Sequence, residues 1–312
     1  MRYLSPLLAA ALTILVGYAL FSALGRDPLA ALHAFFVRPV STANGVAELL
    51  LKASPLMMIA TGLALGFRAN VWNIGAEGQL ILGAICGGGV ALHLEGAASG
   101  WGLALMVVAG ALGGMAWAAI PAFLRTRFNA SEILTSLMLT YVAALLLSYL
   151  VHGPWRDPQG FNFPQSRMFD DALLFPLLVE GTRLNASFLL ALAVVAAGWV
   201  FVHKSFLGYQ MRVAGLADAA ARYAGFSATR TVWIGMLAGG GAAGLAGLAE
   251  VAGPIGQLTP SISPGYGFAA IIVAFVGRLN PVGCALASLL MSLLYLGGEQ
   301  AQMELRLPAA IT

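Results

Sequence analysis

Two interruptions of an otherwise apolar sequence carry side chains that could recognise a small solute. The first, residues 67–79, holds one arginine and one glutamate among uncharged polar groups. Irregular backbone at membrane depth is tolerated only where it lines a watery cavity or is buried in protein. A neutral polar ligand fits this composition better than an open aqueous loop does. We predict a substrate pathway here, to which five residues contribute: Asn70, Trp72, Asn73, Glu77 and Gln79.

The second interruption, residues 253–268, is rich in glycine and proline. It leads into the apolar run 268–277, which as a helix would be about 15 Å long. Gly/Pro-interrupted hydrophobic segments in corresponding halves of a chain are typical of transport sites. Tyr266 and Phe268 are therefore added to the predicted pathway. The alternative interpretation is that both interruptions are ordinary surface loops.

Two carboxylates, Glu77 and Glu250, lie within or beside apolar runs. A carboxylate inside a membrane usually has a specific partner and a function. For Glu77 the obvious partner is Arg68, in a structural ion pair at the helix junction, and contact with substrate is the alternative. Glu250 ends a glycine-rich run and could equally be an interfacial residue.

A different kind of site is predicted in residues 204–230, which are too polar to cross a membrane. Strong helix formers between Gly215 and Gly225 predict a short helix on the cytoplasmic face. This helix could be a surface connector, or it could seat a soluble subunit that drives the protein. Six residues are assigned to the coupling role: Gly215, Asp218, Ala220, Arg222, Tyr223 and Gly225.

Motifs for catalysis and for metal binding are absent from the sequence. Neither of its two lysines, Lys52 and Lys204, completes a G-x-x-x-x-G-K-[ST] phosphate loop. The four histidines are dispersed among different predicted helix ends, so we expect no metal centre. Cys86 and Cys284 lie inside apolar runs and are expected to be buried packing thiols. We expect a non-enzymatic protein with no catalytic residues and no cofactor.

The composition indicates what positions these sites. The chain has 312 residues, of which 60% are hydrophobic and 9% charged, whereas soluble domains carry about 25% charged residues. A soluble domain of this length could not hide so much apolar surface, so its solvent must be lipid. This excludes a cytosolic enzyme, a secreted disulfide scaffold and a nucleic-acid-binding protein.

Apolar runs that could cross the about 30 Å hydrocarbon core of a bilayer recur along the chain. They predict an all-α polytopic bundle with nine crossings, if the short run near the end is counted: 4–24, 46–66, 78–94, 101–124, 133–151, 187–202, 232–252, 268–277 and 282–296. Close helix packing is predicted by four pairs of glycines spaced four residues apart: Gly62/Gly66, Gly110/Gly114, Gly235/Gly239 and Gly240/Gly244.

The basic residues orient the bundle weakly. With the N-terminus in the cytoplasm, nine of them fall inside and seven outside. Nine crossings would leave the C-terminus outside, and residues 307–312 read as the start of a helix. We therefore expect a tenth span after Thr312. The long outer connection 152–186 is a further candidate site, for which docking of an external partner is one interpretation.

Four sequence blocks, residues 62–79, 129–141, 212–225 and 265–283, resemble the permease subunits of bacterial ABC importers. That superfamily serves branched-chain amino acids, simple sugars and nucleosides, and the blocks are most similar to its nucleoside branch. The third block is similar to the family's coupling helix. Thr140 departs from the family pattern, where Asn is expected, which leaves open whether its helix faces the pathway.

The resemblance implies a ten-span permease of two pseudo-repeated halves in the bacterial inner membrane. Residues 1–312 would form one transmembrane domain with a first core (46–151), an extracytoplasmic loop (152–186), a coupling segment (204–230) and a truncated second core (232–312). The implied partners are cytoplasmic ATP-binding subunits that hydrolyse ATP, a second permease subunit in a heterodimer, and an extracytoplasmic substrate-binding lipoprotein.

The expected function is ATP-driven import of a small polar solute, with a nucleoside favoured over a simple sugar or a branched-chain amino acid. Two other functions are considered. An ion-driven carrier would need paired intramembrane carboxylates or a proton-relay histidine, and the predicted spans offer almost none. A structural subunit would have no solute pathway.

Overall fold

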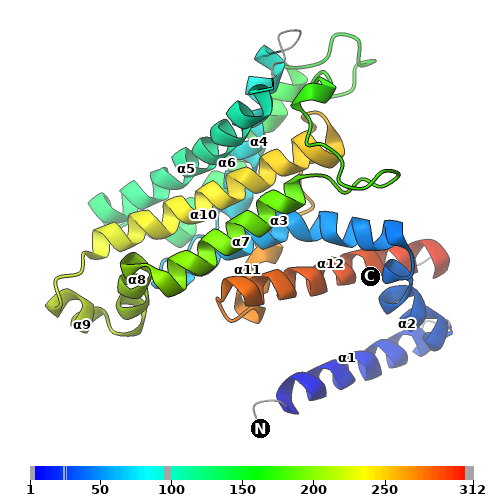
Figure 1. The fold of residues 1–312 in the computed structure, drawn as a ribbon, viewed down its shortest axis with the longest axis horizontal. Coiled ribbons are helices and arrows are strands. Elements are labelled where there is room, and N and C mark those ends of the chain that lie inside the picture. The colour runs from blue at the N-terminus through cyan, green and yellow to red at the C-terminus, as the bar shows by residue number, and fades with distance from the viewer. Residues whose placement is uncertain (1–3, 24, 26, 95–99, 306–312) are drawn as a thin grey trace. The chain divides into compact units, whose positions relative to one another are not determined.

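A computed structural model describes residues 4–23, 25, 27–94 and 100–305, and its ribbon is shown in Figure 1. Among these residues every regular element is a helix, apart from an isolated β-bridge between Leu177 and Asn185. This confirms the all-α prediction. The helices are α1 (Leu4–Ala23), α2 (Pro28–Phe36), η1 (Arg38–Val40), α3 (Ala43–Phe67), α4 (Ala76–His93), α5 (Gly102–Phe128), α6 (Glu132–His152), η2 (Asp171–Leu173), α7 (Ser187–Lys204), α8 (Phe206–Leu216), α9 (Asp218–Tyr223), α10 (Ala228–Glu250), the π-helical η3 (Val251–Ile255), α11 (Tyr266–Val276) and α12 (Pro281–Leu305).

Each of the nine predicted apolar runs coincides with all or part of a helix. Six of the described helices are long and apolar enough to cross a membrane: α3, α5, α6, α7, α10 continued by η3, and α12. With 11 residues, α11 is about 16 Å long and covers half of a bilayer core. The ten-span count and the pseudo-repeat of the two halves stay predictions. The end of the first predicted span, Leu24, and the expected helix start at 307–312 lie outside the described residues.

Two helices, α2 and α8, were not predicted from the sequence. At α2 the start signal is local: the Asp27 carboxylate accepts a hydrogen bond from the Leu29 N–H at 2.9 Å, and Pro28 occupies the first turn. At nine residues, α2 is shorter than a membrane span, which is why a search for long apolar runs misses it.

One compact unit of the chain consists of Met1–Leu50 and Leu289–Thr312. In it α1 contacts α2 near Gly17 and Leu32, and Gly297 of α12 lies against the Phe35 backbone. An ion pair joins Arg38 Nε and Glu304 Oε1 at 3.0 Å. Contacts of α1 and α12 with α2, together with this ion pair, thus hold the unit together.

The other unit, Leu51–Ser288, is organised around α4. This helix contacts α5, α6, α10 and α11, and most of its residues are buried. A helix that is surrounded by protein needs no apolar face toward lipid. Its first turn can therefore contain Glu77 and Gln79, and α4 is not among the six described helices that are long and apolar enough to span.

Glycines set the distance between α10 and its neighbours α4 and α5. A Cβ built on Gly114 would lie 2.1 Å from the Gly240 carbonyl oxygen, and one on Gly244 would lie 2.2 Å from the Gly110 oxygen. One on Gly83 of α4 would lie 2.2 Å from the Gly244 Cα. No real Cβ fits at such distances, so these helices meet backbone to backbone.

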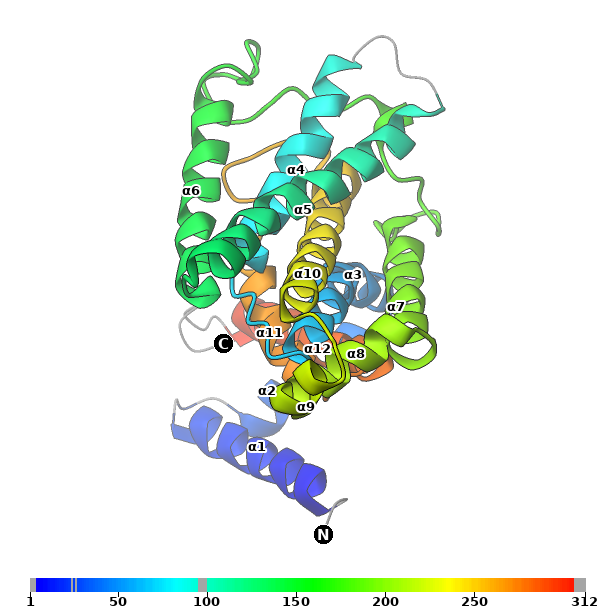
Figure 2. The same cartoon turned by 90° about the vertical axis from the view of Figure 1, so that its left-hand side faces the viewer.

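The other glycine pairs form a second close contact, between α10 and α3. A Cβ on Gly62 would lie 3.1 Å from the Gly239 Cα, and one on Gly235 would lie 3.1 Å from the Gly66 Cα. Figure 2 shows α10 between α5 and α3. All four predicted glycine pairs are thus at helix contacts, as the sequence analysis expected.

We expect Gly114→Ala to destabilise the protein, because the added methyl group would collide with the Gly240 carbonyl and the helices would have to separate. Overpacking of this kind costs about 1–3 kcal/mol. The loss can be measured as a lower thermal unfolding midpoint in detergent. Gly100→Ala is the matched control, since nothing lies within 4 Å of its Cβ position. Equal midpoints for the two variants would contradict this packing.

Candidate functional site

The first interruption begins with a tight turn at the end of α3. Asn70 adopts a left-handed φ of 56°, and the Val71 N–H donates to the Gly66 carbonyl. The Asn70 side chain is exposed and donates from Nδ2 to the Gly215 carbonyl of α8 at 3.1 Å. Asn70, predicted to line the pathway, therefore ties this interruption to α8.

Deeper in the interruption, Asn73 and Gln79 form a closed pair of side-chain amides. Asn73 Nδ2 donates to Gln79 Oε1 at 2.7 Å, and Gln79 Nε2 donates to Asn73 Oδ1 at 2.9 Å. Each residue is 1% exposed. An unpaired amide buried to this degree would be costly, so the pairing fixes how the chain enters α4. In this conformation both amides bind each other and face no open space.

The second interruption is held by the long outer connection. Two N–H groups of that connection bond its backbone, Ser166 to the Leu258 carbonyl at 2.9 Å and Phe169 to the Gly256 carbonyl at 2.8 Å. A third, that of Phe175, bonds the carbonyl of Ala252 just before the interruption at 2.9 Å. Irregular backbone within protein needs such partners. These bonds show that part of the connection has a structural role. The docking of an external partner on residues 152–186 stays a prediction.

The two interruptions meet where α4 and α11 begin. Glu77 Oε2 accepts a hydrogen bond from the Gly267 N–H at 2.6 Å. The Ser263 hydroxyl accepts from the Gly265 and Tyr266 N–H groups at 3.1 and 3.0 Å. The N-terminus of α11 is thus capped by a serine and by a carboxylate from a distant helix, which its dipole favours.

The predicted ion pair between Arg68 and Glu77 is wrong. Arg68 Nε donates instead to the Leu279 carbonyl at 2.7 Å. The reason is geometric, because the interruption separates the two helix ends that carry these residues. Arg68 lies at the end of α3 beside the loop that joins α11 to α12, whereas Glu77 lies at the start of α11, beside N–H groups that have no partner within that helix.

Aromatic rings lie together where the first interruption meets the end of α11. The ring centroid of Trp72 lies 5.3 Å from that of Phe67 and 5.8 Å from that of Phe275, and Phe67 and Phe275 stack at 5.2 Å. Trp72 and Phe268 are 36% and 41% exposed, whereas Tyr266 is buried. Phe275 was not among the predicted residues, although its spacing of seven residues from Phe268 places both on one face of a helix.

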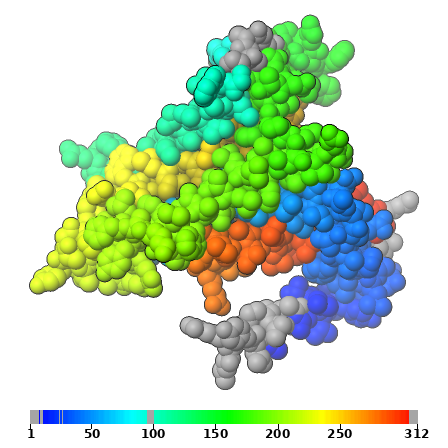
Figure 3. All heavy atoms as spheres, viewed as in Figure 1, coloured from blue at the N-terminus to red at the C-terminus, as the bar shows by residue number. Residues whose placement is uncertain are grey.

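The predicted coupling helix is α9, preceded by the unpredicted α8. Gly215 lies in the last turn of α8, where a Cβ would lie 1.8 Å from the Arg68 carbonyl oxygen. In α9, Ala220 is exposed, and Gly225 lies beyond its end with a φ of 78°. Figure 3 shows residues 206–226 as a projection at the left of the view.

Within α9 the Arg222 guanidinium donates to the Asp218 carboxylate. This hydrogen bond holds the pKa of Asp218 below its usual range, so the pair is charged at neutral pH. The next residue, Tyr223, is 98% exposed. The helix therefore presents a fixed polar pair and a fully exposed aromatic ring.

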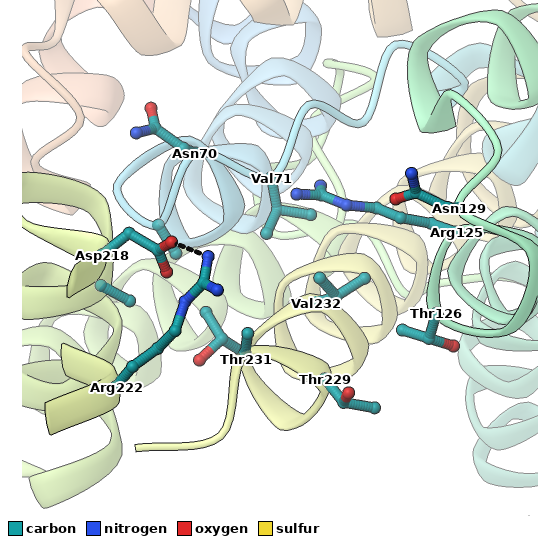
Figure 4. Close-up of a pocket in the computed structure, with 13 residues that line it drawn as sticks. Asn70, Val71, Arg125, Thr126, Asn129, Asp218, Arg222, Thr229, Thr231 and Val232 are labelled. Atoms are coloured by element: carbon teal, nitrogen blue, oxygen red, sulfur yellow. Dashed lines mark hydrogen bonds and ion pairs between the residues drawn. The ribbon is translucent and has the colours of Figure 1, made fainter. Parts of the chain in front are cut away.

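A cavity of about 490 Å³ lies between α9, the start of α10, the end of α5 and the first interruption, and Figure 4 shows its lining. Arg125 at its edge is paired with Glu132, whose Oε1 also accepts from the Trp72 N–H at 3.3 Å. Among the described residues no three His, Cys, Asp or Glu side chains are grouped so that they could hold a metal ion.

We expect Glu77→Ala to destabilise the unit more than Glu77→Gln does, because the amide oxygen of glutamine can still accept the Gly267 N–H bond. A hydrogen bond to a charged group is worth about 1.5–3 kcal/mol. Thermal unfolding in detergent measures the difference, and Glu180→Ala, at an exposed position of the outer connection, is the control. Identical midpoints for Glu77→Ala and the control would show that this bond does not hold the junction.

The chain is similar to known permease proteins. The family model described as branched-chain amino acid transport system / permease component matches residues 45–311. A glucose ABC transporter permease protein of Haloferax volcanii is 39% identical over 100% of this chain and 84% of its own length. A guanosine ABC transporter permease protein of Bacillus subtilis is 30% identical over 85% of this chain and 77% of its own length.

A nucleoside ABC transporter permease protein of Lactococcus lactis is 27% identical over 95% of this chain and 84% of its own length. No solved structure matches the chain significantly. The family match covers most of the chain and includes both interruptions and α9. Together with six helices that could cross a membrane, it shows that the chain belongs to the branched-chain amino acid transport system permease family and is a multi-pass permease subunit of an ABC importer, which is a transport component and not an enzyme.

Proposed function

We propose that this chain forms the membrane pathway of an ATP-driven importer of nucleosides. The observation that carries the proposal is a continuous line of contacts from the exposed helix α9 to both interruptions. α9 follows directly on α8, α8 touches the first interruption at Arg68 and Asn70, and Glu77 joins that interruption to α11. A push on α9 would therefore reach both interruptions.

The energy would come from outside the chain. Partner subunits in the cytoplasm would bind and hydrolyse ATP and press on α9, where Arg222 and Tyr223 are exposed. Gly215 already lies against the Arg68 backbone, so α8 cannot approach the first interruption without displacing it. The bundle would respond by rigid-body motion between outward-open and inward-open states.

The proposed pathway has two kinds of residue. Trp72 and Phe268 offer exposed aromatic faces to the solute, and Phe275 continues the same surface. The remaining predicted residues hold the interruptions in shape through the hydrogen bonds described above, or line the entrance: Asn70, Asn73, Glu77, Gln79 and Tyr266.

Two further partners are proposed on the basis of exposed apolar surface. Ile272 and Val276 of α11 are 58% and 59% exposed, and a second permease subunit in a heterodimer would cover this face.

On the outer connection Phe161 is 93% and Met168 70% exposed. A substrate-binding lipoprotein that delivers the solute would dock there. Single exposed apolar residues are common, but groups of them mark interaction surfaces.

The solute is proposed to be a nucleoside because exposed aromatic faces at the junction can stack on a nucleobase, which is worth about 1–3 kcal/mol per base. Relatives that carry nucleosides or guanosine share 27% and 30% identity with this chain. Glucose is the second candidate, because the glucose permease of Haloferax volcanii is 39% identical. Both solutes are neutral, as the scarcity of charge in the interruptions requires.

We expect proteoliposomes containing the complete complex to take up labelled guanosine, and Trp72→Ala to raise the KM for guanosine about tenfold, since a tenfold change corresponds to about 1.4 kcal/mol. Trp72→Phe should keep most of the uptake because its ring can still stack. Trp101→Ala is the control, at a tryptophan outside the interruptions that is 77% exposed, against 36% for Trp72. Uptake of glucose without guanosine would replace the first candidate solute by the second.

We also expect the double variant Arg222→Ala/Tyr223→Ala to uncouple ATP hydrolysis from uptake, because the pushing surface of α9 is removed while the bundle stays folded. Uptake should fall about tenfold, which corresponds to about 1.4 kcal/mol of coupling free energy. Uptake and ATP hydrolysis are measured on the same proteoliposomes. Tyr149→Ala in α6, another exposed tyrosine, serves for comparison. If the double variant transports as well as the unmodified complex, α9 does not transmit the push.

A further inference from the structure

Asn70 lines a second cavity besides the one in Figure 4. This second cavity has a volume of about 560 Å³, and its walls are the end of α3, the end of α7, helix α8 and the loop between α11 and α12. Three arginines from three of these segments line it: Arg68, Arg212 and Arg278. Segments far apart in the sequence thus bring three positive charges to one cavity.

No carboxylate is among the residues that line this cavity. Within the part of the chain that the structure describes, Arg212 and Arg278 form no ion pair, whereas Arg125 and Arg222 nearby are paired with Glu132 and Asp218. The Arg68 guanidinium gives its Nε–H to Leu279, and its two terminal NH₂ groups are not used by that bond. Burial, and then the charge of Arg212, lower the pKa of Arg68.

The loop that carries Arg278 is held in a specific conformation. Arg278 and Leu279 both adopt a left-handed φ of 54°, which is uncommon for residues other than glycine. The hydrogen bond from Arg68 Nε to the Leu279 carbonyl fixes this loop against the end of α3. Arg68 and Arg278 are therefore placed together by the fold, although their charges repel each other.

The position of the cavity favours a phosphate group as its occupant. Its wall contains the last residues of two candidate spans, α3 and α7, so it lies at the level where a membrane meets water. Tyr209 lines the cavity and is 56% exposed, and tyrosine is enriched where a membrane meets water. Basic pockets between spans on the cytoplasmic side bind phosphate-bearing headgroups.

We propose that Arg68, Arg212 and Arg278 form a binding site for a phosphate group, supplied by an anionic phospholipid headgroup or by free phosphate. Guanidinium groups form paired, charge-assisted hydrogen bonds with phosphate oxygens. The anion would remove the repulsion among the arginines and would hold α8 against the ends of α3 and α12. The site would thus make the seat of the coupling segment dependent on its membrane.

The test uses the complete complex in nanodiscs, with the double variant Arg212→Gln/Arg278→Gln. Arg68 is left unchanged because it also holds the Leu279 loop. The matched control is Arg127→Gln/Arg230→Gln, which removes two exposed arginines that do not line this cavity. Native mass spectrometry counts the phosphatidylglycerol retained after delipidation, and thermal unfolding measures the response to inorganic phosphate against chloride of equal ionic strength.

We expect the unmodified complex and the control to retain phosphatidylglycerol, or to be stabilised by phosphate, more strongly than the double variant Arg212→Gln/Arg278→Gln. The expected difference in apparent affinity is about tenfold, equivalent to about 1.4 kcal/mol. Loss of lipid retention alone identifies the headgroup as the source, and loss of the phosphate response alone identifies the free ion. Equal behaviour of the two double variants in both measurements would overturn the proposal. The proposal would also be overturned if the double variant Arg212→Gln/Arg278→Gln bound phosphatidylglycerol and phosphate normally but lost the ATP-binding subunits. The arginines would then bind a protein partner.

Discussion

The bond between the Glu77 carboxylate and the N-terminus of α11 is the constraint on which the rest of the unit Leu51–Ser288 depends. It joins two residues 190 positions apart and satisfies an N–H group that no turn of α11 can satisfy. Gly267 has to be glycine here, because a Cβ would lie 2.2 Å from the Glu77 backbone nitrogen. A short helix, an irregular segment and the start of α4 are thereby held in one place.

Close glycine contacts provide the rigid frame for that bond. α10 meets α4, α5 and α3 at backbone distance, so the start of α4 cannot shift without separating helices. In lipid there is no hydrophobic driving force between helices, and packing of this kind supplies the association free energy instead. The polar interruptions are therefore supported by the most tightly packed part of the chain.

The sequence predicted the helices that depend on long apolar runs and all four glycine contacts, because both signals are local and periodic. The sequence also predicted that the two interruptions contribute to one site. It did not predict α2 and α8, which are too short to span. It gave Arg68 the wrong partner, because the side chain nearest in sequence was assumed to be nearest in space. The Asn73–Gln79 pair was taken for an open binding surface, since sequence alone does not show which polar groups satisfy each other.

The interruptions are bound at both ends, and this limits how they can move. At one end α8 lies on the Arg68 backbone and accepts the Asn70 bond, and at the other Glu77 holds α11. Breaking a buried hydrogen bond to a charged group costs about 1.5–3 kcal/mol, and breaking the amide pair would expose two further unsatisfied groups. Motion that keeps these bonds and carries α8, the first interruption and α11 together is therefore cheaper than motion within the site. An exposed helix can then act on a buried junction without any flexible element between them.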